Sequence, residues 1–401
     1  MAGNAPHNHR DPAATPVVVA CCRTAIGRAH PERGLFRHVR GDELAAAVVR
    51  AVVERSGVDP LSIEDVVLGA TQQRGELGGN VARTVSLMAG LPLATAGTTV
   101  NRLCGSSLQA LAQACHAIAA GAENVQVVGG VEHMHHLPME SAVDIHPKAF
   151  ARSSRGMLSM GLTAEHLAST YGISRRRQEE YALASHQKAA RADDDGFFDD
   201  EIVRVMGHDE SGGLLEAVRD QSIRADTSLE AMAALEPAFL PQLGTVTAAT
   251  SAPVSDGAAA VLVMSAAEAA RQGLAPLARV VATAVVGVPP AAMGTGPIAA
   301  TQKLLARVAS QGISLSDIDM VELNEAFAAQ AIHFIDSLGL DSERVNVRGG
   351  SLAIGHPLGA SGARITTTLL HAMRDGGGRL GLATMCIGLG QGIAVLFERL
   401  E

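Results

Sequence analysis

The sequence predicts an α/β protein in which helices cover a largely parallel sheet, and three observations lead to this prediction. Short apolar runs bounded by glycine alternate with longer segments whose apolar residues recur at helical spacing. The same order of segments occurs twice along the chain. Hydrophobic residues make up 47% of the 401 residues while aromatic residues make up only 2%, and 42 residues are glycine. This composition suits helices packed closely on a sheet.

The first half alternates strands and helices, with glycine and proline marking the ends. Asp42 is expected to cap a helix that ends at Gly57, and Pro92 stops a second helix. The third strand leads directly to a short loop and another helix. In order, the expected elements are a strand at 17–22, a helix at 42–56, a strand at 65–69, a helix at 80–90 and a strand at 98–100.

The second half repeats this plan. SGVDPLSIEDVVLGA, from Ser56, and QGISLSDIDMVELNEA, from Gln311, carry the same helix end, turn, cap and strand. Each half then gives a glycine-rich loop, a long helix and a buried strand, which predicts internal duplication. The expected elements are a strand at 280–285, a helix at 297–312, a strand at 319–323, a helix at 325–339 and a strand at 344–347.

Four segments follow from this organisation. Residues 1–16 are polar and rich in Pro, Asn and His, without the pattern of a signal or transit peptide, and are expected to be a disordered tail. Residues 17–130 form the first half, which is completed by a later segment at about 251–275. Residues 131–250 are richer in charge and break the alternation, so we expect an inserted loop domain over the sheet edge. Residues 276–401 form the second half.

Charge and cysteine content exclude several classes of protein. A formal net charge of -9 argues against a nucleic-acid partner, and no apolar run is long enough to suggest a membrane span. The 5 cysteines include no C-x-x-C pair, which argues against a disulfide framework or a zinc ribbon and favours a reducing, cytoplasmic location. His133, His135 and His136 lack a carboxylate or cysteine at ligand spacing, so no metal site is expected.

Cys104 is the first candidate for chemistry. It lies in VNRLCGSSLQA, between a strand and the start of a helix. Unpaired N–H groups and the helix dipole favour a thiolate there, and the thiolate is the nucleophilic form of sulfur. A cysteine taken alone is more often a small core residue, and Cys115, on the apolar helix face, keeps that interpretation.

Two further motifs contain groups that transfer protons. His356 lies in GGSLAIGHPLGASGAR, where glycines allow close approach of the backbone and the imidazole can take a proton from a thiol. Cys386 lies in TMCIGLGQG at the junction of a buried strand and a turn. The G-x-G-x-G there is not a dinucleotide fingerprint, because no helix follows it. Asn324, in NEAFAAQ, ends a strand and is placed to orient a water beside the histidine.

Taken together and in this order, these motifs resemble the thiolases over essentially the whole chain after the tail. CGSSLQA, GGVEHMHHLPM, MGLTAEHLA and GLATMCIGLGQGIAVLFER are similar to the thiolase β-subunit of the bacterial fatty-acid oxidation complex. The resemblance implies a five-layered αβαβα fold of two duplicated halves plus a loop domain. It also implies that Cys104 is the nucleophile that carries the acyl group, that His356 is the base that activates the Cys104 thiol, and that Cys386 is the acid and base at the acetyl α-carbon. Asn324 with His356, and the amides of Cys104 and Gly388, would form two oxyanion sites.

The resemblance further implies a coenzyme A site. Arg224 matches the arginine that contacts the adenine end of CoA, and Ser251 is expected to replace a pantetheine-contacting serine whose usual position reads Ala252. Met160, Phe239 and Phe327 are candidates to line the acyl chain, although Met and Phe are more often plain core.

The expected activity is thiolytic cleavage of 3-ketoacyl-CoA by a ping-pong mechanism, with CoA as co-substrate and no tightly bound cofactor. Ser159 before Met160 favours the degradative group over a biosynthetic acetyl-CoA acetyltransferase. A non-catalytic acyl-CoA-binding subunit is the alternative outside enzymes. Expected partners are a second copy of the chain, as a homodimer or dimer of dimers, and a multifunctional β-oxidation α-subunit.

Overall fold

A computed structural model describes residues 12–139 and 143–400. Among these residues, most strands belong to one 11-stranded sheet, in which β2 (Gly27–Arg28) also pairs with β9 and β6 (Ile202–Val203) pairs with β1. The main path runs β11 (Met320–Leu323), β12 (Leu380–Ile387), β13 (Gln391–Arg399), β10 (Ala278–Gly287), β1 (Pro16–Thr24), β9 (Ser255–Ser265), β5 (Val125–His133), β3 (Asp65–Gly69) and β4 (Ala96–Val100).

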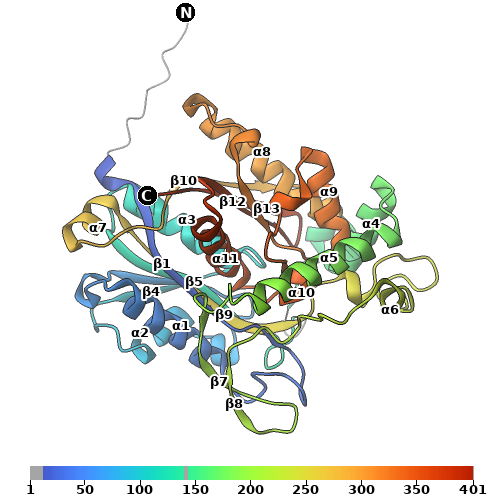
Figure 1. Cartoon of the computed structure of the whole chain (residues 1–401), viewed down its shortest axis with the longest axis horizontal. Coiled ribbons are helices and arrows are strands. Elements are labelled where there is room, and N and C mark those ends of the chain that lie inside the picture. The colour runs from blue at the N-terminus through green and yellow to red at the C-terminus, as the bar shows by residue number, and fades with distance from the viewer. Residues whose placement is uncertain (1–11, 140–142, 401) are drawn as a thin grey trace, which may run out of the picture.

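The sheet has two halves, and a central layer of helices lies between them (Figure 1). The two halves of the sheet meet through only two residue pairs between β1 and β10, Val17 with Arg279 and Val18 with Ala278. Helices α3 (Ser106–Ala119) and α11 (Ser361–Gly376) pack on each other in the middle. Helices α1 (Gly41–Ser56) and α2 (Val81–Met88) cover the outer face of the first half, and α8 (Gly296–Val308) and α9 (Ala328–Leu338) cover that of the second. This is the predicted five-layered αβαβα order.

The expectation of a largely parallel sheet was wrong, because the sheet is mixed. Neighbouring strands run parallel in β3–β4, β3–β5, β11–β12 and β1–β6. By contrast, β9 enters between β1 and β5 and is antiparallel to both. A tight turn joins β12 to β13, and strands joined this way must be antiparallel.

The duplicated motifs give equivalent local structures, as predicted. Gly57 and Gly312 both adopt the left-handed conformation at a helix end, with φ of 69° and 74°. Asp59 and Ser314 then each cap a short 3-10 helix through side-chain hydrogen bonds. Strands β3 and β11 follow in the two halves.

Two local expectations were wrong. Arg40, not Asp42, is the N-cap of α1, and the Asp42 carboxylate instead accepts from the Arg40 guanidinium. The expected strand at 344–347 is reduced to a single bridge between Val345 and Val321. Asn346 has a φ of 49°, and its side chain bonds both the N–H and the carbonyl of Leu323 in place of a second backbone strand. The preceding helix also begins later than expected, at Ala328.

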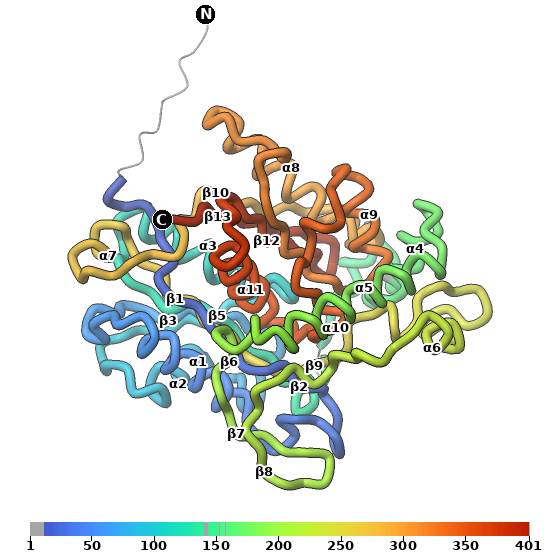
Figure 2. The backbone as a smooth tube through the Cα atoms, in the orientation of Figure 1, coloured from blue at the N-terminus to red at the C-terminus, as the bar shows by residue number. Residues whose placement is uncertain are grey.

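The remaining elements lie mainly between the two halves in sequence (Figure 2). They are helices α4 (Met160–Tyr171), α5 (Arg175–Asp194) and α6 (Leu229–Ala233), and the separate hairpin β7 (Val205–His208) and β8 (Leu214–Ala217). Two short helices complete the fold: α7 (Ala266–Gln272) and α10 (Ser351–Ile354). Residues 1–11 of the expected tail and 140–142 of the expected loop domain lie outside the described residues, while Pro12–Ala14 form a 3-10 turn. Within the described part, no helix has the length and apolarity to cross a membrane.

Candidate active site

Cys104 lies in a short turn between β4 and α3. Gly105 is the N-cap of α3, so Cys104 directly precedes the helix. Leu103 has a φ of 48°, a left-handed conformation that its N–H stabilises by donating to Asn101. Gly105 packs closely on Ile387 at the end of β12, because an added Cβ would lie 2.5 Å from the terminal methyl group of that side chain. The turn therefore presses Cys104 against the second half of the molecule.

The Cys104 sulfur is held mainly as a thiol. Burial raises its pKa to about 11, and the backbone N–H groups of Gly388 and of Cys104 itself only partly oppose this by bonding the thiolate. The sequence-based expectation that the helix terminus favours a thiolate is thus outweighed by loss of solvent. The same observation places the Gly388 amide and the Cys104 sulfur together, as the resemblance implied.

Cys386 is the penultimate residue of β12, opposite Gly392 of β13, and is buried. Burial and the neighbouring Cys104 both raise its pKa well above the ordinary thiol value. The effect of Cys104 shows that these two sulfurs, which are far apart in the sequence, lie close together in the fold. At neutral pH Cys386 consequently holds a proton that it can give to a strong base.

His356 lies in the loop between α10 and α11. Gly355 precedes it with a φ of 120°, where only glycine is comfortable, and an added Cβ would lie 2.6 Å from the Ser255 hydroxyl. That hydroxyl accepts from the His356 N–H at 3.1 Å. Burial, with the positive charge of Arg364, lowers the pKa of the imidazole to about 3. The ring is therefore neutral and able to accept a proton.

Hydrogen bonds determine which ring nitrogen of His356 is basic. With the Ser361 hydroxyl donating to the Pro357 carbonyl at 2.9 Å, the same oxygen accepts from His356 Nδ1 at 2.5 Å. The proton therefore sits on Nδ1, and Nε2 presents a lone pair. Asn324 Nδ2 lies 3.3 Å from Nε2 and donates to it. Asn324 and His356 thus contact each other directly.

Close backbone packing joins the Cys104 and His356 loops. The Ala363 N–H donates to Ser107 at 2.9 Å, so the first turns of α11 and α3 are hydrogen-bonded. Gly362 lies against Leu108, where an added Cβ would meet the backbone nitrogen at 2.4 Å. The two motifs therefore belong to one site at the seam between the halves.

Strand register brings Asn324 to the same place. Leu323 pairs with Thr384 in the parallel ladder of β11 and β12, and the Asn324 N–H donates to the Thr384 carbonyl at 3.0 Å. Cys386 follows Thr384 by two residues on that strand. The amide side chain consequently lies at the end of the sheet at which Cys386 sits, as expected for residues at the carboxyl ends of adjacent parallel strands.

Arg224 and Ser251 line one cavity of about 290 Å³ between the loop region and the second half. Arg224 is exposed, and its backbone N–H donates to His186 at 3.2 Å. Ser251 donates its hydroxyl to the Thr247 carbonyl at 2.8 Å and keeps its lone pairs available. Arg28 lines the same cavity, and burial together with the Arg224 charge lowers its pKa. The cavity therefore presents two guanidinium groups suited to phosphate.

The three apolar candidates gather around Cys386. Met160, Phe239 and Phe327 belong to one cluster with that thiol. Phe239 and Phe327 meet edge to face with ring centroids 6.0 Å apart. Gly161 makes room for this pair, because an added Cβ would lie 2.1 Å from the Phe239 ring. The structure thus places these residues beside the second sulfur.

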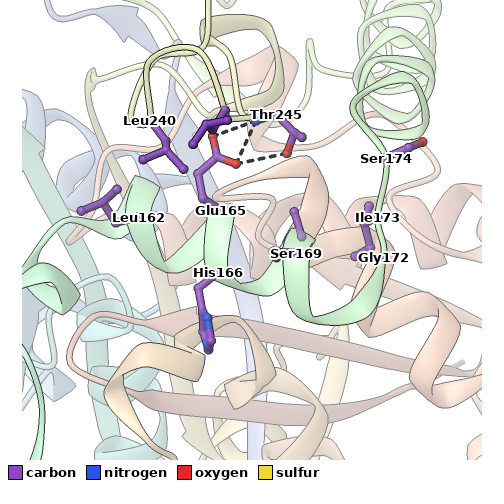
Figure 3. Close-up of a pocket in the computed structure, with 11 residues that line it drawn as sticks. Leu162, Glu165, His166, Ser169, Gly172, Ile173, Ser174, Leu240 and Thr245 are labelled. Carbon is purple, nitrogen blue, oxygen red and sulfur yellow. Dashed lines mark hydrogen bonds between the residues drawn. The ribbon is translucent and has the colours of Figure 1, made fainter.

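A larger cavity of about 680 Å³ contains none of the predicted site residues (Figure 3). It lies between α4 and the 240–245 segment. Glu165 points toward Thr245 and accepts from the backbone N–H groups of Thr245 and Val246, whereas His166 points to the other side of the helix. The Glu165 carboxylate is already occupied by these N–H groups, so it does not serve this cavity as a free acid or base.

The histidine cluster differs from expectation in one respect, because a carboxylate does lie beside it. Glu76 is 3.0 Å from His136 Nδ1, and with His133 these groups could hold a metal ion. The ring nitrogens are nevertheless engaged: His136 Nε2 lies 3.0 Å from the Arg37 carbonyl, and His133 Nε2 lies 3.1 Å from that of Phe36. The two rings stack at 3.8 Å and 14°, so their lone pairs do not converge.

Sequence reasoning missed the residues that hold the site together. Glu132 is fully buried and accepts from the N–H groups of Thr71, Gln72 and Gly359, so it ties the His356 loop to the end of β3. Its position two residues after a glycine pair in GGVEH was the available signal, since carboxylates are rarely buried without a structural or functional reason. Ser361, at the start of α11, was missed as a hydrogen-bond partner of His356.

Comparisons with known proteins identify the family of the chain. The thiolase N-terminal domain matches residues 16–267 and the thiolase C-terminal domain matches residues 274–399. A 3-ketoacyl-CoA thiolase of Aliivibrio fischeri is 52% identical over 390 residues, covering 96% of this chain and 99% of the relative. One of Shewanella frigidimarina is 49% identical over 387 residues, with the same coverage.

Solved structures share the whole fold. The crystal structure of human mitochondrial 3-ketoacyl-CoA thiolase has a TM-score of 0.88 at 35% identity, covering 97% of this chain and 100% of that one. The Bacillus anthracis acetyl-CoA acetyltransferase has a TM-score of 0.87 at 38% identity, covering 96% and 99%. With both domains matched in order and relatives aligned over nearly their full length, the chain belongs to the thiolase family.

Proposed function

We propose that this protein is a 3-ketoacyl-CoA thiolase, which uses Cys104 to cleave its substrate into acetyl-CoA and an acyl-CoA two carbons shorter. The observation that carries the proposal is the proximity of the half-buried Cys104 to the buried Cys386, whose pKa the charge of Cys104 raises, next to the Gly388 amide. Carbon–carbon cleavage needs a nucleophile at one carbon and a proton donor at the next, and these two thiols supply both.

In the first half-reaction, Cys104 gives its proton to His356 Nε2 and attacks the 3-keto carbon. The imidazole is neutral, because its pKa is lowered to about 3, so Nε2 has a lone pair for this proton. The same low pKa makes it a weak base, so stabilisation of the substrate oxyanion must offset the cost of the transfer. Protonation also changes the contact with Asn324, because Nε2–H and the Asn324 amide would then both be donors at 3.3 Å. Both groups are thereby released to donate to a negatively charged substrate oxygen.

The bond between the α-carbon and the former keto carbon then breaks, leaving an acyl thioester on Cys104 and the enolate of acetyl-CoA. Cys386 protonates the enolate and becomes a thiolate. Its raised pKa ensures that the proton is present when the enolate forms. In the second half-reaction Cys386 takes the proton of a free CoA thiol, the CoA thiolate attacks the acyl group, and Cys104 leaves and recovers its proton from His356.

CoA serves as co-substrate, and the scheme uses no tightly bound cofactor. The cavity containing Arg224 and Ser251 supports binding of the CoA nucleotide and pantetheine, and Arg28 adds a second cation for phosphate. The cluster of Met160, Phe239 and Phe327 would contact the acyl portion, because it adjoins Cys386.

A second copy of the chain is the proposed partner, as a homodimer or a dimer of dimers. Strand β4 is the edge of the sheet, and its residues are exposed or half-buried. Leu87 and Leu93, on either side of the α2–β4 turn, are 47% and 81% exposed. An unpaired edge with apolar neighbours favours strand pairing between copies. A β-oxidation α-subunit and a cytoplasmic location remain part of the proposal through the likeness to bacterial relatives.

A biosynthetic acetyl-CoA acetyltransferase is the second candidate, favoured by the fold and identity shared with the Bacillus anthracis enzyme. A series of CoA-dependent cleavage rates, from acetoacetyl-CoA to long 3-ketoacyl-CoA, separates the two. The degradative function predicts efficient cleavage of long substrates, with or without an added α-subunit. Activity confined to acetoacetyl-CoA would support the alternative. Absence of any acyl-enzyme by mass spectrometry would instead indicate a non-catalytic subunit.

A further inference from the structure

A continuous series of buried hydrogen bonds leads into His356 from a fully buried arginine. Arg364 donates to the Ser351 hydroxyl at 2.7 Å, and Ser351 donates to Asn324 Oδ1 at 2.7 Å. Asn324 Nδ2 then donates to His356 Nε2 at 3.3 Å. Arg364, Ser351 and Asn324 have no exposed surface. The series therefore runs through the interior, away from solvent exchange.

The direction of every bond in this series is fixed from its two ends. A guanidinium can only donate, so the Ser351 oxygen accepts from Arg364 and its single proton must go to Asn324. At the other end the Pro357 carbonyl can only accept, which orients Ser361 and places the proton of His356 on Nδ1. The amide of Asn324 is the one group in between that could be reversed without moving the backbone.

Reversal of that amide would be damaging. It would turn Oδ1 toward His356 Nε2, where the imidazole presents a lone pair, and Nδ2 toward Ser351, whose oxygen already accepts from Arg364. An acceptor would face an acceptor, and the site would lose the Asn324 N–H groups that face the reacting region.

We propose that Arg364 and Ser351 are positioning residues for the thiolase reaction, which fix the amide of Asn324 so that its N–H groups face His356. This inference rests on the proposed function. Neither residue touches the reacting atoms; each acts through Asn324. Ser351 also connects the site to the CoA cavity, because the next residue in α10, Leu352, lines that cavity.

Placement of Arg364 fits this role better than that of a structural ion pair. Its ion pair with the buried Glu322 is long, at 3.7 Å, which is beyond hydrogen-bond distance. Among the described residues, Nε and Nη1 of Arg364 have no hydrogen-bond partner, so the bond to Ser351 is the one directed contact of the guanidinium. Burying the guanidinium of Arg364 with so few hydrogen bonds costs desolvation free energy, so a contribution to stability does not explain why an arginine stands at this position.

The test is a double-mutant cycle of Ser351→Ala with Asn324→Ala. We expect Ser351→Ala to lower kcat by roughly 10- to 100-fold with little change in the KM for CoA, as for misplacement of a group that assists the reaction. In the Asn324→Ala background the same change should have almost no further effect. Additive losses would overturn the proposal, because they would mean that Ser351 acts independently of Asn324.

Matched variants separate positioning from folding. Thr367→Val removes another buried hydroxyl, one turn along α11 from Arg364, that donates to the Ala363 carbonyl at 2.9 Å and lies beside Cys21 rather than beside Ser351 or Asn324. It should leave kcat unchanged. Arg364→Lys should retain more activity than Arg364→Met, since lysine can still donate to Ser351; equal losses would contradict the proposal. Should the Arg364 variants not fold, the Ser351 cycle decides the question by itself.

One measurement does not depend on turnover. In ¹⁵N NMR spectra of the whole protein, His356 should carry its proton on Nδ1 with an unprotonated, hydrogen-bonded Nε2, and Ser351→Ala should shift the Nε2 signal while Thr367→Val should not. An unshifted Nε2 signal in Ser351→Ala would refute the proposed positioning role of Ser351. If the wild-type protein gives these His356 signals but does not catalyse thiolysis, the proposed function is overturned while the positioning of Asn324 by Ser351 and Arg364 still holds.

Discussion

Glu132→Gln tests two effects of one buried carboxylate: its hydrogen bonds stabilise the fold around the site, and its negative charge raises the pKa of Cys104. The carboxylate oxygens of Glu132 accept from Thr71, Gln72 and Gly359 at 3.0, 3.1 and 2.9 Å. Glutamine retains one oxygen, which can accept from Thr71 and Gly359, but its NH2 group would face the Gln72 N–H. Two charged bonds become neutral at ~1 kcal/mol each, and one orphaned donor costs ~1–3 kcal/mol, so the free energy of unfolding should fall by about 3–5 kcal/mol.

The same substitution should make Cys104 more reactive. The negative charge of Glu132 contributes to the raised pKa of Cys104, so its removal should lower that pKa. The pH midpoint of Cys104 alkylation by iodoacetamide, located by mass spectrometry, should move down although the protein is less stable in urea. Opposite signs of the two effects distinguish an electrostatic cause from general loosening.

Glu165→Gln provides the matched control. Glu165 is also a buried carboxylate that accepts backbone N–H groups, those of Thr245 and Val246, but it lies in the loop region and does not contribute to the pKa of Cys104. It should destabilise the protein and leave the alkylation midpoint in place. If Glu132→Gln leaves the midpoint unchanged, or if both variants move it equally, the electrostatic reasoning fails.

Cys104→Ser should abolish the covalent acyl-enzyme, seen as loss of the acyl mass after mixing with acyl-CoA; persistent labelling would place the nucleophile elsewhere. Cys386→Ala should lower kcat by ~10²–10⁴-fold while alkylation of Cys104 by iodoacetamide survives, and an equal loss of both would remove the distinction between the thiols. Arg224→Ala should raise the KM for CoA several-fold at constant kcat, whereas a fall in kcat alone would contradict a binding role. His186 and His356, with pKa values lowered to about 4 and about 3, give stability that is present above about pH 6.5 and lost as the pH falls toward 4. The urea midpoint should accordingly fall between pH 7 and pH 5, and a constant midpoint would count against the burial of neutral imidazoles.

The parts of the fold that could be predicted from sequence are those fixed by local rules. Alternating apolar runs and glycine helix ends identified most strands and helices of both halves, and the repeated Gly-x-cap pattern at Gly57 and Gly312 revealed the duplication. Strand direction was not predictable this way, because it depends on where a chain returns after a long excursion. The β9 strand enters between β1 and β5 only because the loop region delivers it there.

The site shows the same division. Cys104 and His356 were identified because each sits in a glycine-rich loop before a helix, where local geometry restricts residue choice. The groups that set their protonation could not be identified, since Glu132, Ser351 and Arg364 act through long-range contacts between different elements. The pKa of Cys104 was likewise misjudged, because a sequence shows the helix start but not the degree of burial.

Duplication explains why the chemistry lies at the seam. Each half contributes one glycine-rich loop and one central helix, and the loops meet only when α3 packs on α11 with Gly362 against Leu108. Any side chain at Gly362 would lie 2.4 Å from the Leu108 nitrogen and push the helices apart. Because Ser107 and Ala363 are hydrogen-bonded at the same crossing, such a displacement would separate the first sulfur from the imidazole loop. The proposed nucleophile and its proposed base are therefore assembled by the docking of the halves rather than by either half alone.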